Sequence, residues 1–309
     1  MPVFGWLAQP AVLPWVALAF GLCVGSFLNV VIYRLPRMMD REWLENVPDI
    51  LEGSNEIKDR EASKRLAKSV RDQIAHFSND RLNLAVPRSC CPACGHQIAA
   101  LHNIPLLSWI ALRARCARCG ARISAVYPTV ELLAGLGAAW SVLHFGLSLA
   151  AAGAAVFVWC TIALAFIDQR TGYLPDEITL PLLWLGLILN IDATFVPLRD
   201  ALVGAAGGYL FLWLVYWGFK LMFQKEGMGY GDFKMMAAVG AFLGWKILPI
   251  VILISSVVGL AFGILQMLAA RGGWQSGFKF HFGPYIAIAG VVALFWGADI
   301  AGRWLPQFT

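Results

Sequence analysis

Long uncharged apolar runs are the feature that most constrains this chain. Several of them reach the roughly 20 residues that a helix needs to cross a hydrocarbon core of about 30 Å. The chain is 59% apolar and 14% charged, whereas soluble domains average roughly 45–50% and about 25%. A soluble fold could not hide so much apolar surface, so the sequence predicts an all-α polytopic membrane protein. The bundle should have about eight transmembrane helices, at residues 10–33, 126–146, 149–168, 178–195, 200–222, 233–248, 249–270 and 283–304.

The weakest division lies at Gly244–Trp245–Lys246, which only briefly interrupts one long apolar stretch. The first apolar run is expected to be a retained helix rather than a signal peptide, because no Lys or Arg precedes Arg34.

The distribution of basic residues predicts the orientation in the membrane. Most of the 24 Lys and Arg lie between Arg34 and Arg122, and a basic segment beside a span stays in the cytoplasm. Alternating eight spans from there places both termini on the periplasmic side of a bacterial inner membrane. The sequence therefore divides into a first helix at residues 1–34, a cytoplasmic module at 35–125 and a transmembrane bundle at 126–309.

The first part of the module, residues 38–83, is rich in charge of both signs. Glu and Lys recur there at i, i+3 and i+4 between Ser54 and Lys68, a pattern that supports a solvated helix. An exposed helix without chemistry is one interpretation. Docking of a partner or of anionic lipid headgroups is the other.

The second part of the module, residues 90–120, carries two Cys-x-x-Cys pairs. Two such pairs complete a tetrahedral sulfur site, which is typical of structural Zn²⁺ and leaves no position open for catalysis. Disulfides are disfavoured in the reducing cytoplasm, and a redox site would need only one pair. The predicted ligands are Cys91, Cys94, Cys116 and Cys119.

Three carboxylates fall within or beside the predicted spans, where an acidic residue is a functional candidate by default. Asp168 ends the third span, Asp232 follows Gly229–Tyr–Gly231, and Glu131 lies one turn into the second span. Two close carboxylates in a low-dielectric site share one proton, so one can activate water while the other polarises a carbonyl. Asp168 and Asp232 therefore predict aspartic protease chemistry. Gly229 and Gly231 would let the backbone turn sharply and a substrate chain come close.

Each of these residues also has a structural interpretation. Asp168 could face lipid headgroups, and the Gly-x-Gly-Asp tetrapeptide could be a plain turn. Asp176, after Leu174–Pro175, is well placed as a helix N-cap. Glu131 could satisfy a hydroxyl or pair with an Arg of the module.

Several segments together resemble the type IV prepilin peptidase family, the bifunctional leader peptidases and N-methyltransferases of type IV pilus and type II secretion systems. The resemblance covers nearly the whole chain. Its segments are Gly25–Pro36, Pro87–Ser89 with the cysteine pairs, Asn103–Trp109, Ile123–Glu131, Phe166–Asp168 with Leu174–Asp176, and Gly227–Lys234.

The resemblance implies the activity, the cofactors and the partners. The family's catalytic aspartates fall on Asp168 and Asp232, supported by Gly229, Gly231, Asp176 and Lys234. The substrates would be type IV prepilins and type II secretion pseudopilins, whose short basic leader is removed after a glycine. S-adenosylmethionine would then methylate the new α-amine. The partners are thus prepilins and membrane lipid, with no nucleic acid.

The part linked to methylation falls on Gly25, Ser26, Asn29, Arg34 and Glu131. Asn29 and Arg34 would meet the new amine or the carboxylate of the donor. The alternative is that Asn29 satisfies backbone between helices and Arg34 anchors to lipid headgroups.

Three other functions stay open. A proton-coupled transporter would also carry buried carboxylates, but it should show two related halves. A non-catalytic scaffold would have no use for paired aspartates. Peptidase activity without methyl transfer is the third.

Overall fold

The computed structural model describes residues 11–53, 59–77, 82–99, 103–225, 228–269 and 281–304. These residues form helices joined by loops, with isolated β-bridges and no strand, so the predicted all-α fold is confirmed. The elements are α1 (Leu13–Gly53), α2 (Arg60–Phe77), α3 (Leu107–Ala111), α4 (Val126–Phe145), α5 (Leu149–Thr171), α6 (Asp176–Leu189), η3 (Asn190–Asp192), α7 (Leu198–Phe223), α8 (Tyr230–Leu243), α9 (Leu248–Ala269) and α10 (Gly283–Trp304).

Each predicted span corresponds to a helix of the bundle. Six helices in the described part of the chain are long and apolar enough to cross a membrane, namely α1, α4, α5, α7, α9 and α10. The other two, α6 and α8, have 14 residues each, or about 21 Å of rise, which is short of the hydrocarbon thickness. The break at Gly244 is real, because its φ of 74° ends α8.

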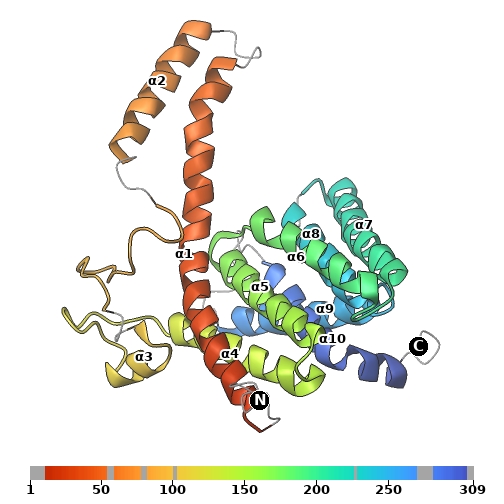
Figure 1. The fold of residues 1–309 in the computed structure, drawn as a ribbon. Helices are drawn as coiled ribbons and strands as arrows, with labels where there is room; N and C mark the ends of the chain where they lie inside the picture. The colour runs from red at the N-terminus through yellow and green to blue at the C-terminus, as the bar shows by residue number, and fades with distance from the viewer. Residues whose placement is uncertain are drawn as a thin grey trace.

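Helix α1 is much longer than the predicted first span. It has 41 residues, so it is about 60 Å long, roughly twice the thickness of a hydrocarbon core. The helix therefore does not end near Arg34 but continues through Pro36 and Pro48 into the charged segment. Figure 1 shows this distal half projecting from the bundle, with α2 folded back along it.

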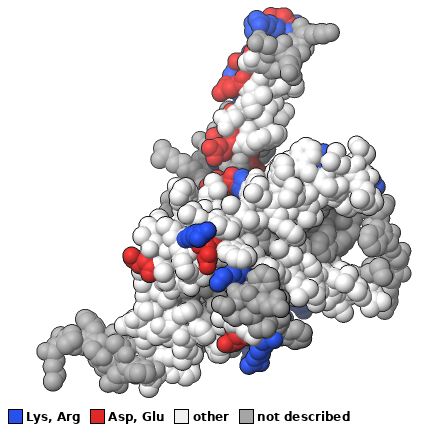
Figure 2. Space-filling view, turned by 90° about the vertical axis from the view of Figure 1, so that its right-hand side faces the viewer, with Lys and Arg blue, Asp and Glu red and all other residues white. Residues whose placement is uncertain are grey.

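The projecting hairpin of α1 and α2 is held by polar contacts. Arg71 of α2 donates to Glu52 at 2.7 Å and to Asp49 at 3.0 Å, and the Ser63 hydroxyl donates to the Leu51 carbonyl. The expected solvated helix is thus present as α2, although it begins at Arg60 and residues 54–58 lie outside the described part. Figure 2 shows acidic and basic side chains gathered on this hairpin, whereas most of the visible bundle surface carries neither.

Helix α8 lies at the centre of the bundle and packs against α6, α7 and α10. Nearly all of its residues are buried, from Asp232 to Leu243. Its last carbonyls are satisfied by Asn190, whose amide donates to the Ala241 and Phe242 carbonyls. Because protein surrounds α8, its short length leaves no polar backbone facing lipid.

The contact between α7 and α8 is a direct meeting of two backbones. A Cβ added at Gly240 would meet the Gly204 carbonyl oxygen, and one added at Gly204 would meet that of Gly240. Small residues allow such an approach where lipid supplies no hydrophobic drive. This contact fixes the depth and direction of α8, and with them the position of Asp232.

Gly240→Ala should therefore destabilise the bundle by about 1–3 kcal/mol, the usual range for overpacking. Gly218→Ala on α7 is the matched control, because a Cβ there meets nothing within 4 Å and alanine favours a helix. Thermal unfolding of both variants in detergent measures the difference. Equal melting temperatures would contradict the close contact.

Candidate active site and metal centre

Asp168 and Asp232 lie on different helices at the same end of the bundle. Asp168 is in the last turn of α5 and Asp232 is in the first turn of α8. The two residues are 5% and 6% exposed, and their carboxylates are close enough for their charges to interact. Asp168 is buried, so it does not face lipid headgroups. The structure thus brings together the two carboxylates that the sequence paired.

Asp168 is held by the start of α10. The backbone N–H of Gly283 donates to Asp168 Oδ2 at 3.1 Å, and a Cβ on Gly283 would lie 2.6 Å from that oxygen. The ring of His281 is near enough to interact electrostatically with the same carboxylate. Sequence reasoning missed both residues. The dipeptide Gly283–Pro284 before an apolar run does mark a helix N-terminus, and such an end carries free N–H donors.

Asp232 has fewer partners. Its carboxylate interacts with the backbone N–H of Gly229, whereas Oδ1 is buried and has no hydrogen-bond partner. A buried polar atom without a partner is rare and calls for an explanation. Because Oδ1 belongs to one member of a carboxylate pair, the space beside it is a natural place for a water or a substrate carbonyl.

The two glycines before Asp232 act differently from what the sequence suggested. Gly229 has φ −85° and ψ 152°, an ordinary extended conformation, so the expected sharp turn that needs glycine is wrong. A Cβ on Gly229 would meet only Asp232 Oδ2 and the Gly231 nitrogen, both at 4.0 Å, which leaves the approach to the carboxylate open. A Cβ on Gly231 would lie 2.7 Å from Leu174 Cβ. Glycine at that position therefore lets α8 lie against the loop that follows α5.

Asp176 is not the N-cap that the sequence indicated. The N-cap of α6 is Pro175, without a side-chain hydrogen bond, and Asp176 is the first helical residue. Both carboxylate oxygens of Asp176 lie 2.7 Å from Lys234 Nζ. This ion pair joins the start of α6 to the start of α8. Its lysine lies two residues after Asp232. A local cap rule could not identify a partner 58 residues away in the chain.

The four predicted cysteines form one cluster. Their sulfur atoms all lie within 4.8 Å of one another, and Cys91 Sγ is 3.8 Å from Cys119 Sγ. Sulfurs placed about 2.3 Å from a tetrahedral Zn²⁺ are separated by about 3.8 Å, so the cluster fits that ion.

The two Cys-x-x-Cys halves of the cluster have the same backbone conformation. Gly95 donates to the Cys91 carbonyl and Gly120 to the Cys116 carbonyl, and the two glycines have φ of 68° and 70°. The backbone N–H groups of Cys119 and Arg118 lower the pKa of the Cys116 thiol to about 6. Despite the Ala121 backbone N–H, the hydrogen bonds with Cys94, Cys116 and Cys91 raise the pKa of the Cys119 thiol to about 11. Metal binding would therefore release the protons that the cluster still holds.

The residues that the resemblance links to methylation make the contacts between α1, α4 and the cysteine module. They are Gly25, Ser26, Asn29, Arg34 and Glu131. A Cβ on Gly25 would lie 2.6 Å from Glu131 Cα. The carboxylate of Glu131 interacts with the Ser26 side chain and accepts from the Leu106 backbone N–H at 2.9 Å. Glu131 therefore satisfies a hydroxyl, one of its two structural interpretations, and it also holds the left-handed turn at Leu106, whose φ is 57°.

Asn29 and Arg34 both bind backbone. Asn29 Nδ2 donates to the Tyr127 carbonyl at 3.0 Å, so it satisfies backbone between α1 and α4. Arg34 is 8% exposed, and its guanidinium donates to the carbonyls of Asn83 at 2.8 Å and Pro87 at 2.6 Å. The lipid-anchor interpretation of Arg34 is therefore wrong. Arg34 instead fastens the loop that leads into the cysteine cluster.

Comparison with known proteins divides the chain into two matched regions. Residues 19–145 match the bacterial peptidase A24 N-terminal domain, and residues 155–264 match the type IV leader peptidase family. A prepilin leader peptidase/N-methyltransferase of Aeromonas salmonicida is 49% identical over 296 residues, 94% of each chain. Relatives of the same name in Stutzerimonas stutzeri and Pseudomonas aeruginosa are 46% and 44% identical, over 98% and 99% of this chain and 98% of theirs. No solved structure matches.

The ion pair between Asp176 and Lys234 predicts a reciprocal charge effect. Asp176→Lys or Lys234→Asp alone should slow the peptide cleavage expected at Asp168 and Asp232 about two- to fivefold. That factor corresponds to the free energy of a partly exposed ion pair. The double exchange should restore most of the rate. An initial-rate assay of the three variants measures this. A double variant slower than both single variants would contradict a role for the pair.

The cysteine cluster predicts about one zinc per chain. Cys94→Ser and Cys119→Ser should each lose most of the metal and loosen the module, because metal binding there is also folding free energy. Cys23→Ser is the matched control, since that exposed thiol lies in α1 outside the cluster. Elemental analysis of the purified protein checks the prediction. A zinc-free wild type, or disulfides among the four cysteines, would overturn it.

Proposed function

Because the chain belongs to the type IV leader peptidase family, we propose that it removes the leader from prepilins and N-methylates the new N-terminus. The observation that carries the peptidase half is the buried pair Asp168 and Asp232, with an unpartnered oxygen on Asp232. A proton-coupled transporter or an assembly scaffold would not need two carboxylates at one edge of the bundle. The relatives that match over nearly the whole chain carry both activities in their names.

The surroundings of the two aspartates favour different roles. Asp168 accepts an N–H from Gly283 and lies near His281, and both contacts favour its ionised form. Asp232 is buried with Oδ1 unpaired, which favours its neutral form. Asp168 would therefore take a proton from the attacking water, while Asp232 donates to the scissile carbonyl. The tetrahedral intermediate collapses when the leaving amine receives a proton from Asp168.

The surrounding residues position this pair. Gly283 orients Asp168, Gly231 brings α8 against the loop after α5, and Lys234 binds Asp176 at the start of α6. The four cysteines would hold a structural Zn²⁺ that takes no part in cleavage, because four thiolates leave no open position.

The finer assignments are also proposals. We place the chain in the bacterial inner membrane with its hairpin and cysteine cluster in the cytoplasm, since the basic residues concentrate there. Residues 1–34, 35–125 and 126–309 would then be the first helix, the cytoplasmic module and the peptidase bundle. Pseudopilins would be cut as prepilins are, after a glycine. S-adenosylmethionine would supply the methyl group, and lipid would surround the apolar faces of α7 and α9.

The proposal predicts that Asp168→Asn and Asp232→Asn each lower cleavage about a hundredfold or more, because an amide can neither take the proton from water nor share one. Methylation of a pre-cut substrate should persist. Asp192→Asn, an exposed carboxylate in η3, is the matched control. The measurement is cleavage of a purified prepilin by enzyme in detergent, with labelled S-adenosylmethionine for the second activity. Normal cleavage by either variant would remove that aspartate from the active site.

A further inference from the structure

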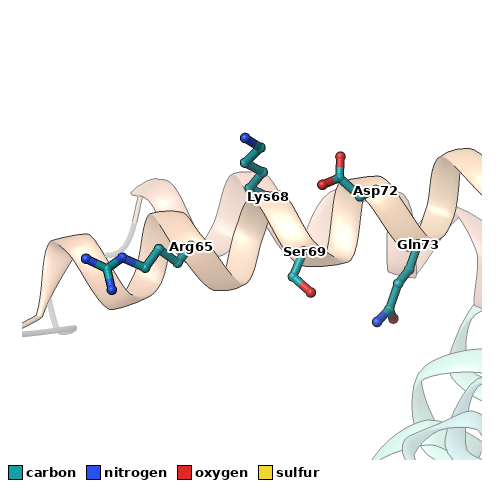
Figure 3. Close-up of a pocket in the computed structure, with 5 residues that line it drawn as sticks. All are labelled: Arg65, Lys68, Ser69, Asp72 and Gln73. Atoms are coloured by element: carbon teal, nitrogen blue, oxygen red, sulfur yellow. The ribbon is translucent and has the colours of Figure 1, made fainter.

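Two hollows in the N-terminal part of the chain do not point to a ligand. One, shown in Figure 3, is lined by Arg65, Lys68, Ser69, Asp72 and Gln73, which all project from the single helix α2. A surface formed by one exposed helix does not enclose a ligand, and this one carries charge of both signs. The other hollow lies between α1 and the loop at 84–89, and its Arg34 already binds backbone carbonyls. A different pair of arginines, where α1 meets α5, has no such partners among the described residues.

The guanidiniums of Arg37 in α1 and Arg170 in α5 converge on one aromatic ring. The Cζ atom of Arg37 lies 3.9 Å from the centroid of the Tyr33 ring, and that of Arg170 lies 5.7 Å from it. Both distances are within the roughly 6 Å at which the face of such a ring attracts a cation. The two arginines come from helices that pack side by side (Figure 1). Tertiary packing therefore builds this cluster, which no single exposed helix could form.

No acidic side chain neutralises the two arginines. Both are exposed, and neither belongs to an ion pair between described residues. Asp40 lies one turn beyond Arg37 in α1 but is not paired with it. Asp168, two residues before Arg170, accepts instead from the backbone N–H of Gly283. Two like charges beside one ring repel each other, so the cluster favours an anion that contacts both guanidiniums.

The cluster lies where the surface of the membrane is expected. Tyr33 is the last residue of the first predicted span, and Arg170 lies two residues beyond the end of the third. The basic residues assign both of these ends to the cytoplasmic side. Tyr127, at the start of α4, is near enough to Tyr33 and to both arginines to interact with them electrostatically, and tyrosines are enriched at this level of a membrane. Because anionic headgroups make the cytoplasmic surface of a membrane negative, the expected anion is a lipid headgroup.

We propose that Arg37 and Arg170 together bind the phosphate of one anionic phospholipid in the cytoplasmic leaflet, beside Tyr33 and Tyr127. A guanidinium presents paired N–H donors that match the oxygens of a phosphate, so two of them hold one phosphate from both sides. The lipid would thereby join α1 to the end of α5 that carries Asp168. The assignment rests on the proposed orientation in the membrane and does not depend on the peptidase activity.

The test is native mass spectrometry of the full-length, zinc-loaded protein in detergent, titrated with phosphatidylglycerol or with zwitterionic phosphatidylcholine. The wild type should retain one phosphatidylglycerol more tightly than any phosphatidylcholine. Arg37→Gln and Arg170→Gln should each weaken binding of that lipid about tenfold or more, because each removes a charge-assisted hydrogen bond. The double variant should show no preference for phosphatidylglycerol.

The matched control is Arg199→Gln, which should bind phosphatidylglycerol as the wild type does. Arg199 is exposed and precedes Asp200, whose backbone carbonyl accepts from Trp245 just past the end of α8. It therefore lies at the opposite end of the bundle from Asp232. Zinc content and melting temperature in phosphatidylcholine should match the wild type in every variant, which excludes misfolding.

The number of retained lipids separates one shared site from two. Two tightly bound lipids in the wild type, with one left in each single variant, would show separate sites and overturn the shared one. Equal retention of the two phospholipids by the wild type, or unchanged binding in both single variants, would overturn the proposal. Displacement of the lipid by inorganic phosphate at the same concentration would show a free-phosphate site and overturn the lipid assignment. Cleavage of a prepilin by the same preparations tests the peptidase separately, so either proposal can fail alone.

Discussion

Removing a carboxylate from water costs several kcal/mol unless a proton or hydrogen bonds compensate, and this chain removes two at one end of its bundle. The start of α10 supports one of them, through the N–H of Gly283. Asp232 receives less support and keeps an unpaired oxygen. Helix N-termini attract negative charge, and the starts of α8 and α10 both lie at this pair. Two ionised carboxylates placed in this way would repel each other.

The central position of α8 is what makes this arrangement possible. Its backbone meets that of α7 at Gly204 and Gly240, and its far end is closed by Asn190. With both its side and its end held, α8 presents Asp232 at a fixed depth. The ion pair between Lys234 and Asp176 then adds a lateral link to α6.

The N-terminal half is joined to this bundle through α1 rather than through a flexible linker. Glu131 of α4 holds the loop at Leu106, and Arg34 of α1 holds the loop at 83–87. Both loops lead into or out of the cysteine cluster. The cysteine module is therefore held to α1 and α4, and α1 in turn contacts α5, where the Arg170 guanidinium lies over the Tyr33 ring.

The sequence by itself determined the helical membrane fold, the four-cysteine cluster and the pairing of Asp168 with Asp232. These features depend on composition, on short spacings and on motifs in order, all of which are local. Tertiary structure alone decided that Gly283 supports Asp168, that Asp176 pairs with Lys234 and that Arg34 binds carbonyls near Pro87. These partners lie 115, 58 and 53 residues apart, so no local pattern relates them. The sequence also did not predict that α1 continues to Gly53. The change from apolar to charged residues marks the end of the membrane span, but the helix itself continues beyond it.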